Sequence, residues 1–121
     1  MMADGLPLLD HVVLADLRDS TGGDEDFVRE LVEAYVTETA GYLEAMRAAA
    51  AAGDAAAIVR PAHTLKSSSA TLGAMRLSAI SRGLEEAGRA GRGEALSAEV
   101  EAAHLTWTAT LEALSAAGLT A

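Results

Sequence analysis

The longest helical pattern in this chain is FVRELVEAYVTETAGYLEAMRAAAAA, residues 27–52. Its apolar residues recur at intervals of three and four, and its glutamates mostly occupy other positions of the helical wheel, which is typical of an amphipathic helix. The residues expected to face the core are Phe27, Leu31, Ala34, Tyr35, Tyr42, Ala45, Met46 and Ala49. Asp24 to Asp26 supply an N-cap and first-turn carboxylates, and Gly53 indicates the end. The stretch therefore predicts one long helix with a single buried face.

Four more helical segments surround this stretch. A short helix is predicted over about residues 8–19, and a third helix over about residues 55–72. A fourth ends in the glycines of residues 88–93, and a fifth runs up to Gly118. The stripes expected to face the core are Ile58, Ala62, Leu65, Ser69 and Leu72 in the third helix, Leu77, Ile80, Leu84 and Ala87 in the fourth, and Leu96, Val100, Ala103, Trp107, Leu111 and Leu114 in the fifth. Since no stretch alternates like a strand, we expect an all-α fold, an up-and-down antiparallel four-helix bundle over about residues 24–118 with a short additional N-terminal helix.

Length and composition favour one small folded domain over residues 1–121. Half of the residues are hydrophobic but only 3% are aromatic, so small side chains dominate the expected core. Without cysteine, the chain has no disulfide, thiolate metal site or cysteine nucleophile. The net charge of -9 argues against binding to nucleic acid or to an anionic membrane. Because the sequence shows neither a signal peptide nor an apolar run long enough to cross a membrane, we expect a soluble cytoplasmic protein.

The third predicted helix presents a histidine to solvent. At about 100° per residue, His63 lies nearly opposite Leu65 and Leu72 on the wheel, so it points away from the apolar stripe. The residues expected within about 60° of it are Val59, Arg60, Lys66, Ser67 and Ala70. This face combines an imidazole, two permanent cations and small neighbours, which makes it receptive to anions.

The charge of the chain is distributed unevenly around this histidine. Residues 58–92 contain six Lys and Arg against two Glu, whereas the remaining residues hold three basic against sixteen acidic side chains. A basic third inside an acidic protein suits the docking of an acidic partner surface or an incoming phosphoryl group.

The residues around His63 carry a longer pattern. The run AHTLKSSSATLGA, residues 62–74, closely resembles the signature A-H-x-L-K-[GS]-S-[SA]-x-x-[LF]-G of histidine-containing phosphotransfer (HPt) domains, the phosphocarriers of multistep two-component relays. The resemblance extends to Leu77 and to the downstream stretch LEEAGRAG, which contains Leu84, Glu85, Gly88 and Gly91. It covers about residues 6–118, nearly the whole chain. A bare H-x-x-K would be weak support, but the full run in a helical context is specific.

The resemblance implies roles for individual residues. It makes His63 the phosphoaccepting imidazole, through Nε2, and it gives Lys66 the role of offering an ammonium to the phosphoryl oxygens. It places Ser67 at the small-residue position that lets a partner approach, where a bulky side chain should block docking. The expected partner-docking residues are Val59, Arg60, Ser67 and Ala70, with Met75 a further candidate for an apolar patch.

The resemblance also implies a reaction and its partners. His63 would receive a phosphoryl group from the phosphoaspartate of a receiver domain in a hybrid histidine kinase, and pass it reversibly to a response regulator. A neutral imidazole suits this step because its ordinary pKa of about 6.5 leaves a nucleophilic nitrogen near pH 7. The sequence lacks a P-loop and clustered carboxylates on the histidine face, so we expect no cofactor or metal on this chain. The Mg²⁺ is expected on the receiver, and the protein is expected to be a monomeric phosphocarrier rather than an enzyme.

Two alternatives to the relay function stay open. One is the phosphoacceptor module of a chemotaxis-type histidine kinase, phosphorylated directly by an ATP-binding domain; the compact length favours a stand-alone relay protein instead. The other is a helical adaptor that binds a receiver without phosphotransfer, against which the intact His63 and Lys66 argue.

Two local features depart from the simplest interpretation. Pro61 cannot donate to the carbonyl of Ala57, which predicts either a tolerated kink, the preferred interpretation, or a break near Val59 with a fresh helical start. The serines of residues 67–69 could suggest a serine nucleophile beside His63, but no acid is expected to orient the pair and no oxyanion-hole motif is present. We expect the second and third of these serines to lie on the buried side and bond to carbonyls one turn earlier.

Overall fold

The computed structural model describes residues 5–93 and 96–120, and within these ranges the regular secondary structure is helical, with turns and short loops between the helices. The predicted domain span of 1–121 also includes a few positions outside the described residues. The helices are α1 (His11–Ser20), α2 (Glu25–Ala51), α3 (Ala56–Thr71), α4 (Met75–Arg89) and α5 (Leu96–Ala116). The all-α prediction is confirmed, and each predicted helix is present with its ends within a few residues of those expected.

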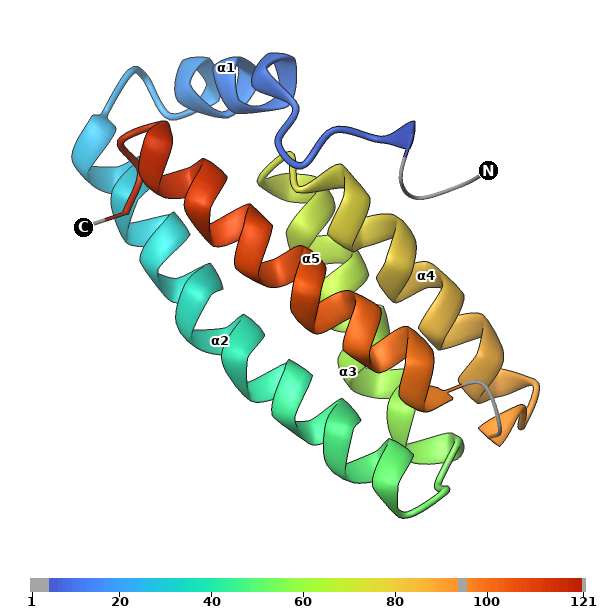
Figure 1. The fold of residues 1–121 in the computed structure, drawn as a ribbon. Helices are drawn as coiled ribbons and strands as arrows, with labels where there is room; N and C mark the ends of the chain where they lie inside the picture. Colours follow the sequence, from blue (N-terminus) through green and yellow to red (C-terminus); the bar gives the residue numbers. More distant parts are fainter. Residues whose placement is uncertain (1–4, 94–95, 121) are drawn as a thin grey trace.

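The four longer helices lie side by side, and α1 crosses the end of the bundle where α2 begins and α5 ends (Figure 1). The principal contacts join α3 to α4, α2 to α3, α4 to α5 and α2 to α5, so each long helix packs against two others. Among the described helices, none is both long and apolar enough to span a membrane.

The α2 helix begins and ends where the sequence indicates. The Asp24 carboxylate caps it by accepting a hydrogen bond from the Phe27 backbone N–H at 3.1 Å, and Glu25 and Asp26 lie in the first turn, near the positive end of the helix dipole. Gly53 closes the C-terminal end with a φ of 66°, a conformation that glycine adopts without steric cost.

The buried face of α2 agrees with the predicted one at Tyr35, Met46 and Ala49, and it differs by about one residue at the other predicted positions. Its buried residues are Val28, Val32, Tyr35, Thr39, Leu43, Met46 and Ala49. Phe27 is 45% exposed, Ala34 and Ala45 are exposed, and Leu31 and Tyr42 are only partly buried. Two adjacent apolar stripes share this helix, and periodicity alone does not distinguish them; packing against α3 and α5 selects the second stripe. In α4 and α5 the predicted stripes are buried except for Ile80 and Leu111, which are partly exposed.

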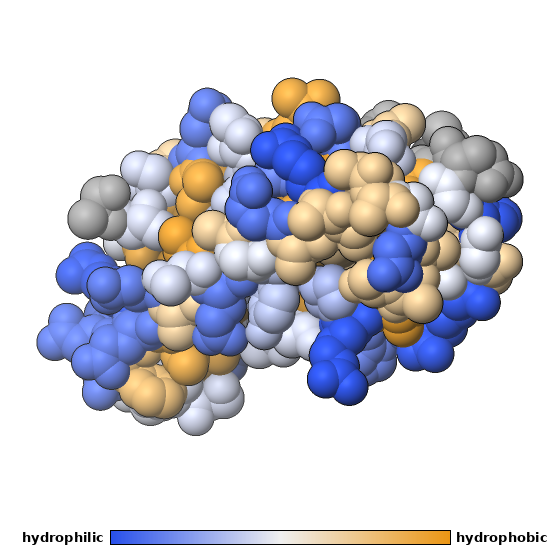
Figure 2. Space-filling view, turned by 90° about the horizontal axis from the view of Figure 1, so that it is seen from below, coloured by the Kyte–Doolittle hydropathy of each residue, from blue (hydrophilic) through white to orange (hydrophobic). Residues whose placement is uncertain are grey.

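Because only one of the two apolar stripes of α2 is buried, apolar residues also contribute to the exposed surface. Seen from below, hydrophilic residues are interspersed with hydrophobic ones, some weakly and some strongly hydrophobic (Figure 2). A pale area on the right half lies where the alanine-rich end of α2 turns into α3, a region in which Ala51, Ala52, Ala56 and Ala57 are exposed (Figure 2). Alanine is there for its high helix propensity rather than for burial.

The α3 helix runs continuously through Pro61. All five residues of its predicted inward stripe are buried, and the predicted alternative of a break near Val59 is wrong. The helix starts ahead of that point, since the Asp54 carboxylate accepts from the Ala57 N–H at 3.2 Å. Burial of Ile58 and Ala62 on either side of the proline offsets the missing backbone hydrogen bond, which costs about 3 kcal/mol in an unsupported helix.

The turn between α3 and α4 is held by the N-terminal segment. The Asp10 N–H donates to the Gly73 carbonyl at 2.7 Å, and Arg76 donates from its backbone N–H to Pro7 and from Nε to the Leu6 carbonyl. Gly73 has a φ of 80°, and a Cβ there would lie 2.9 Å from the Asp10 carbonyl oxygen. Only glycine therefore fits this turn.

Candidate functional site

His63 lies on α3 with its side chain 56% exposed, on the face opposite the buried Leu65 and Leu72. This confirms the exposure predicted from the helical wheel. The ring is nevertheless held on one side, because Nδ1 lies 2.9 Å from Oε2 of Glu85 on α4. Among the described residues, the hydrogen bonds of the ring involve Nδ1 and not Nε2.

Glu85 is the centre of the site. Its side chain is only 8% exposed, and its two oxygens meet three basic side chains. Oε1 accepts from Lys66 Nζ at 2.7 Å, while Oε2 faces His63 and also accepts from Arg89, at 2.9 Å from Nη2 and 3.3 Å from Nε. The hydrogen bonds from Lys66 and then Arg89 outweigh the effect of burial and lower the pKa of Glu85 from 4.5 to about 2. Glu85 is thus a buried carboxylate that stays ionised at neutral pH.

The approach of α4 to α3 places Glu85 beside His63. Gly88, one turn after Glu85, is buried against the start of α3, where an added Cβ would lie 2.8 Å from the Ala55 carbonyl oxygen and 3.0 Å from Val59 Cγ2. The missing side chain lets the two helices approach closely. The nearby Ser78 hydroxyl donates to the Lys66 carbonyl at 2.8 Å and fixes the same pair of helices.

An ionised carboxylate can only accept hydrogen bonds, and this determines the tautomer of His63. When the imidazole is neutral, its proton must lie on Nδ1 to meet Glu85, so the lone pair lies on Nε2. The ring nitrogen that does not face Glu85 is therefore the nucleophilic one.

The structure brings together some of the sequence-predicted residues and not others. Lys66 lies on the histidine face as predicted, but its side chain is only 28% exposed and its ammonium binds Glu85. Arg60 and Ser67 are exposed on the same face, whereas Val59 and Ala70 are partly buried. Although Lys66 shares the face of the exposed histidine, the buried carboxylate draws its ammonium inward.

Glu85 was missed as a site residue by sequence reasoning, and the expectation that no acid orients His63 is wrong. The carboxylate comes from another helix, 22 residues along the chain, where helical spacing gives no signal. One pattern does mark it: Ser78, Ser81, Glu85 and Gly88 recur at three and four residues and are all buried. A glutamate within a stripe of small residues indicates a buried carboxylate that needs partners. No group of three or more His, Asp or Glu residues that could hold a metal is present in the described ranges.

Among the serines after His63, Ser69 packs between helices. Ser69 is fully buried, and its hydroxyl lies 2.7 Å from the Tyr35 hydroxyl on α2, so the expected bond to a carbonyl one turn earlier is wrong for this residue. Tyr35 in turn packs edge-on against Trp107 of α5, and burial raises its pKa to about 12. Ser68 does donate to the Leu65 carbonyl, at 3.4 Å. These contacts join three helices behind the histidine.

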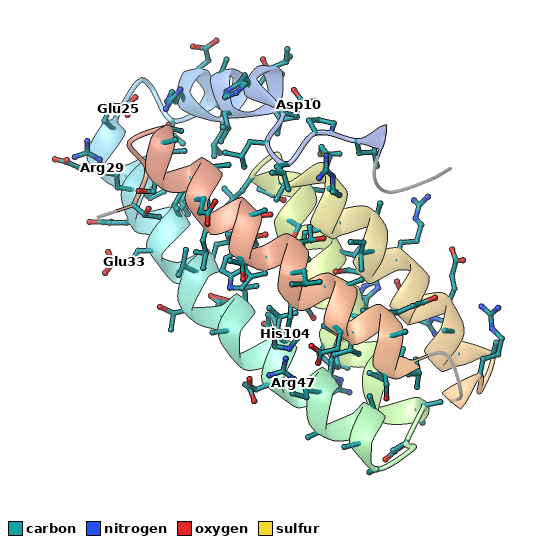
Figure 3. The ribbon with its side chains drawn as sticks, in the orientation of Figure 1. Asp10, Glu25, Arg29, Glu33, Arg47 and His104 are labelled. Atoms are coloured by element: carbon teal, nitrogen blue, oxygen red, sulfur yellow. The ribbon has the colours of Figure 1, made fainter. Side chains whose placement is uncertain are left out.

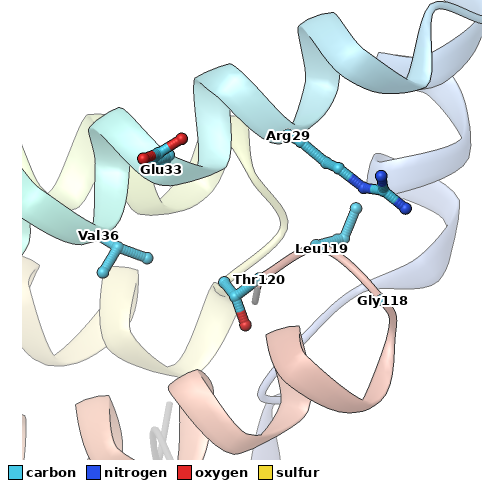
Figure 4. Close-up of a pocket in the computed structure, with 6 residues that line it drawn as sticks. All are labelled: Arg29, Glu33, Val36, Gly118, Leu119 and Thr120. Atoms are coloured by element: carbon cyan, nitrogen blue, oxygen red, sulfur yellow. The ribbon is translucent and has the colours of Figure 1, made fainter.

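Other polar features lie elsewhere on the molecule. Arg47 on α2 forms a bidentate ion pair with Glu101 on α5, beside His104 (Figure 3). A pocket between α2 and the C-terminal residues is lined by Arg29, Glu33, Val36, Gly118, Leu119 and Thr120 (Figure 4). Neither feature contains a residue of α3 or α4, the helices that carry the histidine and its carboxylate.

The low pKa of Glu85 predicts an acid-dependent contribution to stability. Its folded pKa of about 2 lies below the ordinary 4.5, so Glu85 stabilises the fold above pH 4.5 and loses this effect as the pH falls toward 2. In a Glu85→Gln protein the effect is absent. The difference in free energy of unfolding between the two proteins, measured by urea denaturation, should therefore narrow from about pH 5 to pH 2. Exposed Glu86→Gln is the matched control, and a difference that stays constant with pH would contradict the assignment.

Known proteins are similar to this chain over the helices that carry the site. A family model described as Hpt domain matches residues 30–117, which include most of α2 and all of α3 to α5. The crystal structure of histidine-containing phosphotransfer protein B (HptB) from Pseudomonas aeruginosa PAO1 is similar, with 32% sequence identity and a TM-score of 0.79. The similarity covers 86% of this chain and 88% of that one. Among curated proteins, none matches the sequence.

Proposed function

The chain belongs to the Hpt domain family of histidine phosphotransfer proteins, phosphocarriers that work with receiver domains, and on this premise we propose that His63 is the relay residue. It accepts a phosphoryl group from the phosphoaspartate of a receiver domain in a hybrid kinase and passes it reversibly to the aspartate of a response regulator. The observation that carries this proposal is the His63–Glu85 pair, in which a buried, ionised carboxylate holds Nδ1 of a half-exposed ring, so that the lone pair of the neutral imidazole lies on Nε2.

The step is a direct phosphoryl exchange. The Nε2 lone pair attacks phosphorus, an N–P bond forms, and the P–O bond to the donor aspartate breaks with its electron pair on the leaving carboxylate. His63 keeps its Nδ1 proton throughout, so the positive charge that develops on the ring faces the Glu85 carboxylate at 2.9 Å. The return step to a second receiver is the same exchange in reverse.

Charge neutralisation is divided between the partners in this proposal. Lys66 lies one turn after His63, and its flexible ammonium turns from Glu85 to the oxygens of the transferring group. The receiver supplies its aspartate and Mg²⁺, whose charge stabilises the same oxygens when bound. This chain supplies the nucleophile, its orientation and one mobile cation.

We further propose that the receiver docks over the histidine face. Arg60 and Ser67 offer exposed polar contacts there, and the partly exposed Val59, Ala70 and Met75 offer small apolar ones. Because transfer requires release, the interface should be small and transient, and the protein a monomer. The short connections between helices and their ring of contacts support an up-and-down antiparallel bundle as the scaffold for this face.

The test is phosphoryl transfer from phosphorylated receiver domains. We expect radiolabel to appear on this protein within seconds to minutes, in an acid-labile and alkali-stable form that maps to His63. Receivers of hybrid kinases and of response regulators are tried as separate donors, with a buffer-only arm as the blank. Binding of a receiver with no transfer of label would favour the adaptor alternative, and label from ATP and a kinase ATP-binding domain alone would favour the chemotaxis-type module.

A further inference from the structure

Arg89 meets the same carboxylate oxygen as the histidine. Its Nη2 and Nε lie 2.9 and 3.3 Å from Glu85 Oε2, the atom that faces His63 Nδ1, while Lys66 takes the other oxygen. We propose that Arg89 is a positioning residue, which holds Glu85 against His63 while Lys66 turns to the phosphoryl group. This inference rests on the proposed function and adds a residue that contacts neither the imidazole nor the phosphoryl group.

The need for such a residue follows from burial. Glu85 is 8% exposed, and its charge is matched by Lys66 and Arg89. If Lys66 left Oε1 and no other cation remained, the buried carboxylate would keep only the Nδ1–H of His63. An incompletely paired buried charge is unfavourable, so it would take up a proton or turn outward, and either change removes the acceptor that sets the tautomer. Arg89 prevents this.

The chemistry of arginine suits the role of holding Glu85, and the chemistry of lysine suits the role of changing partners. The guanidinium is planar and permanently charged, and it approaches Oε2 with two N–H groups, so it fixes the orientation of the carboxylate. The lysine ammonium is a single point on a flexible chain and is able to change partners. Arg89 is also four residues after Glu85 on α4, so the pair stays together whatever docks on α3.

The arrangement predicts that Lys66 and Arg89 support Glu85 redundantly in the resting protein. The probe is the tautomer of neutral His63, read from ¹⁵N chemical shifts of the imidazole in the full chain at a pH where the ring is deprotonated. Arg89→Ala and Lys66→Ala alone should each keep mainly the Nδ1–H form. The double variant should lose this preference by more than the two single effects combined.

Phosphotransfer gives the second readout. Because Lys66 is engaged with the phosphoryl group during transfer, Arg89→Ala should lower the transfer rate about fivefold even though its resting tautomer is nearly unchanged. Arg89→Lys should recover part of the rate. The matched control is Arg92→Ala, an exposed arginine on the turn after α4, which should behave like the unmodified protein in both measurements.

The two readouts distinguish a failure of the proposed function from a failure of the positioning role of Arg89. If the unmodified protein takes no label from any receiver, the proposed function fails, and the tautomer measurement still tests Arg89. If the unmodified protein transfers normally while Arg89→Ala matches Arg92→Ala, or if the double variant is merely additive, the positioning role is overturned. Arg89 is 62% exposed, so its replacement leaves the core intact.

Discussion

A His63→Gln protein is expected to accept no measurable phosphoryl group from a phosphorylated receiver, a loss of at least about a thousandfold in rate. Glutamine fits the site without supplying the chemistry. Its amide N–H can still donate to the Glu85 carboxylate, but its nitrogen lone pair is delocalised into the carbonyl and does not attack phosphorus. The measurement is the initial rate of acid-labile label transfer at equal protein concentrations.

Two controls make this result specific to the site. His11→Gln changes an exposed histidine on α1 and should transfer label at the unmodified rate. The far-ultraviolet circular dichroism and thermal midpoint of His63→Gln should match those of the unmodified protein, because a side chain that is 56% exposed contributes little to the core. A His63→Gln protein that accepts label at the same rate would refute the site assignment.

Lys66→Ala should produce the second large effect, a transfer rate about 10- to 100-fold lower. The variant removes the cation proposed to neutralise the transferring oxygens while leaving the proposed nucleophile in place. It should also lower the free energy of unfolding at neutral pH by about 1–2 kcal/mol, because Glu85 loses its shortest hydrogen bond, the 2.7 Å contact to Nζ. A lysine that merely faced solvent would show no such loss of stability.

The two effects of Lys66 can be separated. In a Lys66→Ala, Glu85→Gln double variant the buried group is neutral and needs no cation, so part of the stability returns, while the transfer rate stays low. Lys66→Arg keeps the charge and should retain more transfer than alanine. Equal transfer rates in Lys66→Ala and the unmodified protein would count against the proposed role, and unchanged stability would count against the ion pair.

The helical framework followed from local patterns. The inward stripe of α3 was predicted correctly because Ile58, Leu65 and Leu72 recur every seven residues, which places them on one face of the helix. The inward face of α2 was predicted about one residue away, because Phe27 and Val28 begin two adjacent apolar stripes of similar strength. A wheel identifies an apolar arc, but the neighbouring helices select which part of it is buried.

The geometry of the site explains part of the uneven charge distribution of the chain. The basic stretch of residues 58–92 includes Lys66 and Arg89, and both are engaged by one of its two glutamates. Arg60 lies on the exposed face near His63 and remains the predicted contact for an acidic partner. Part of the local positive charge therefore serves the internal carboxylate, and part is presented to the outside.

Periodicity and motif alone placed His63 on an exposed helix face with Lys66 one turn away, because both relations follow from 3.6 residues per turn within a single helix. The tertiary structure added the carboxylate. Glu85 reaches His63 from 22 residues away because α4 approaches α3 closely at Gly88, and that contact also makes the lysine an internal ion-pair partner and engages Arg89. Local spacing predicts which side chains share a face. Which charges share a buried oxygen depends on how two helices pack, and that is a property of the folded chain.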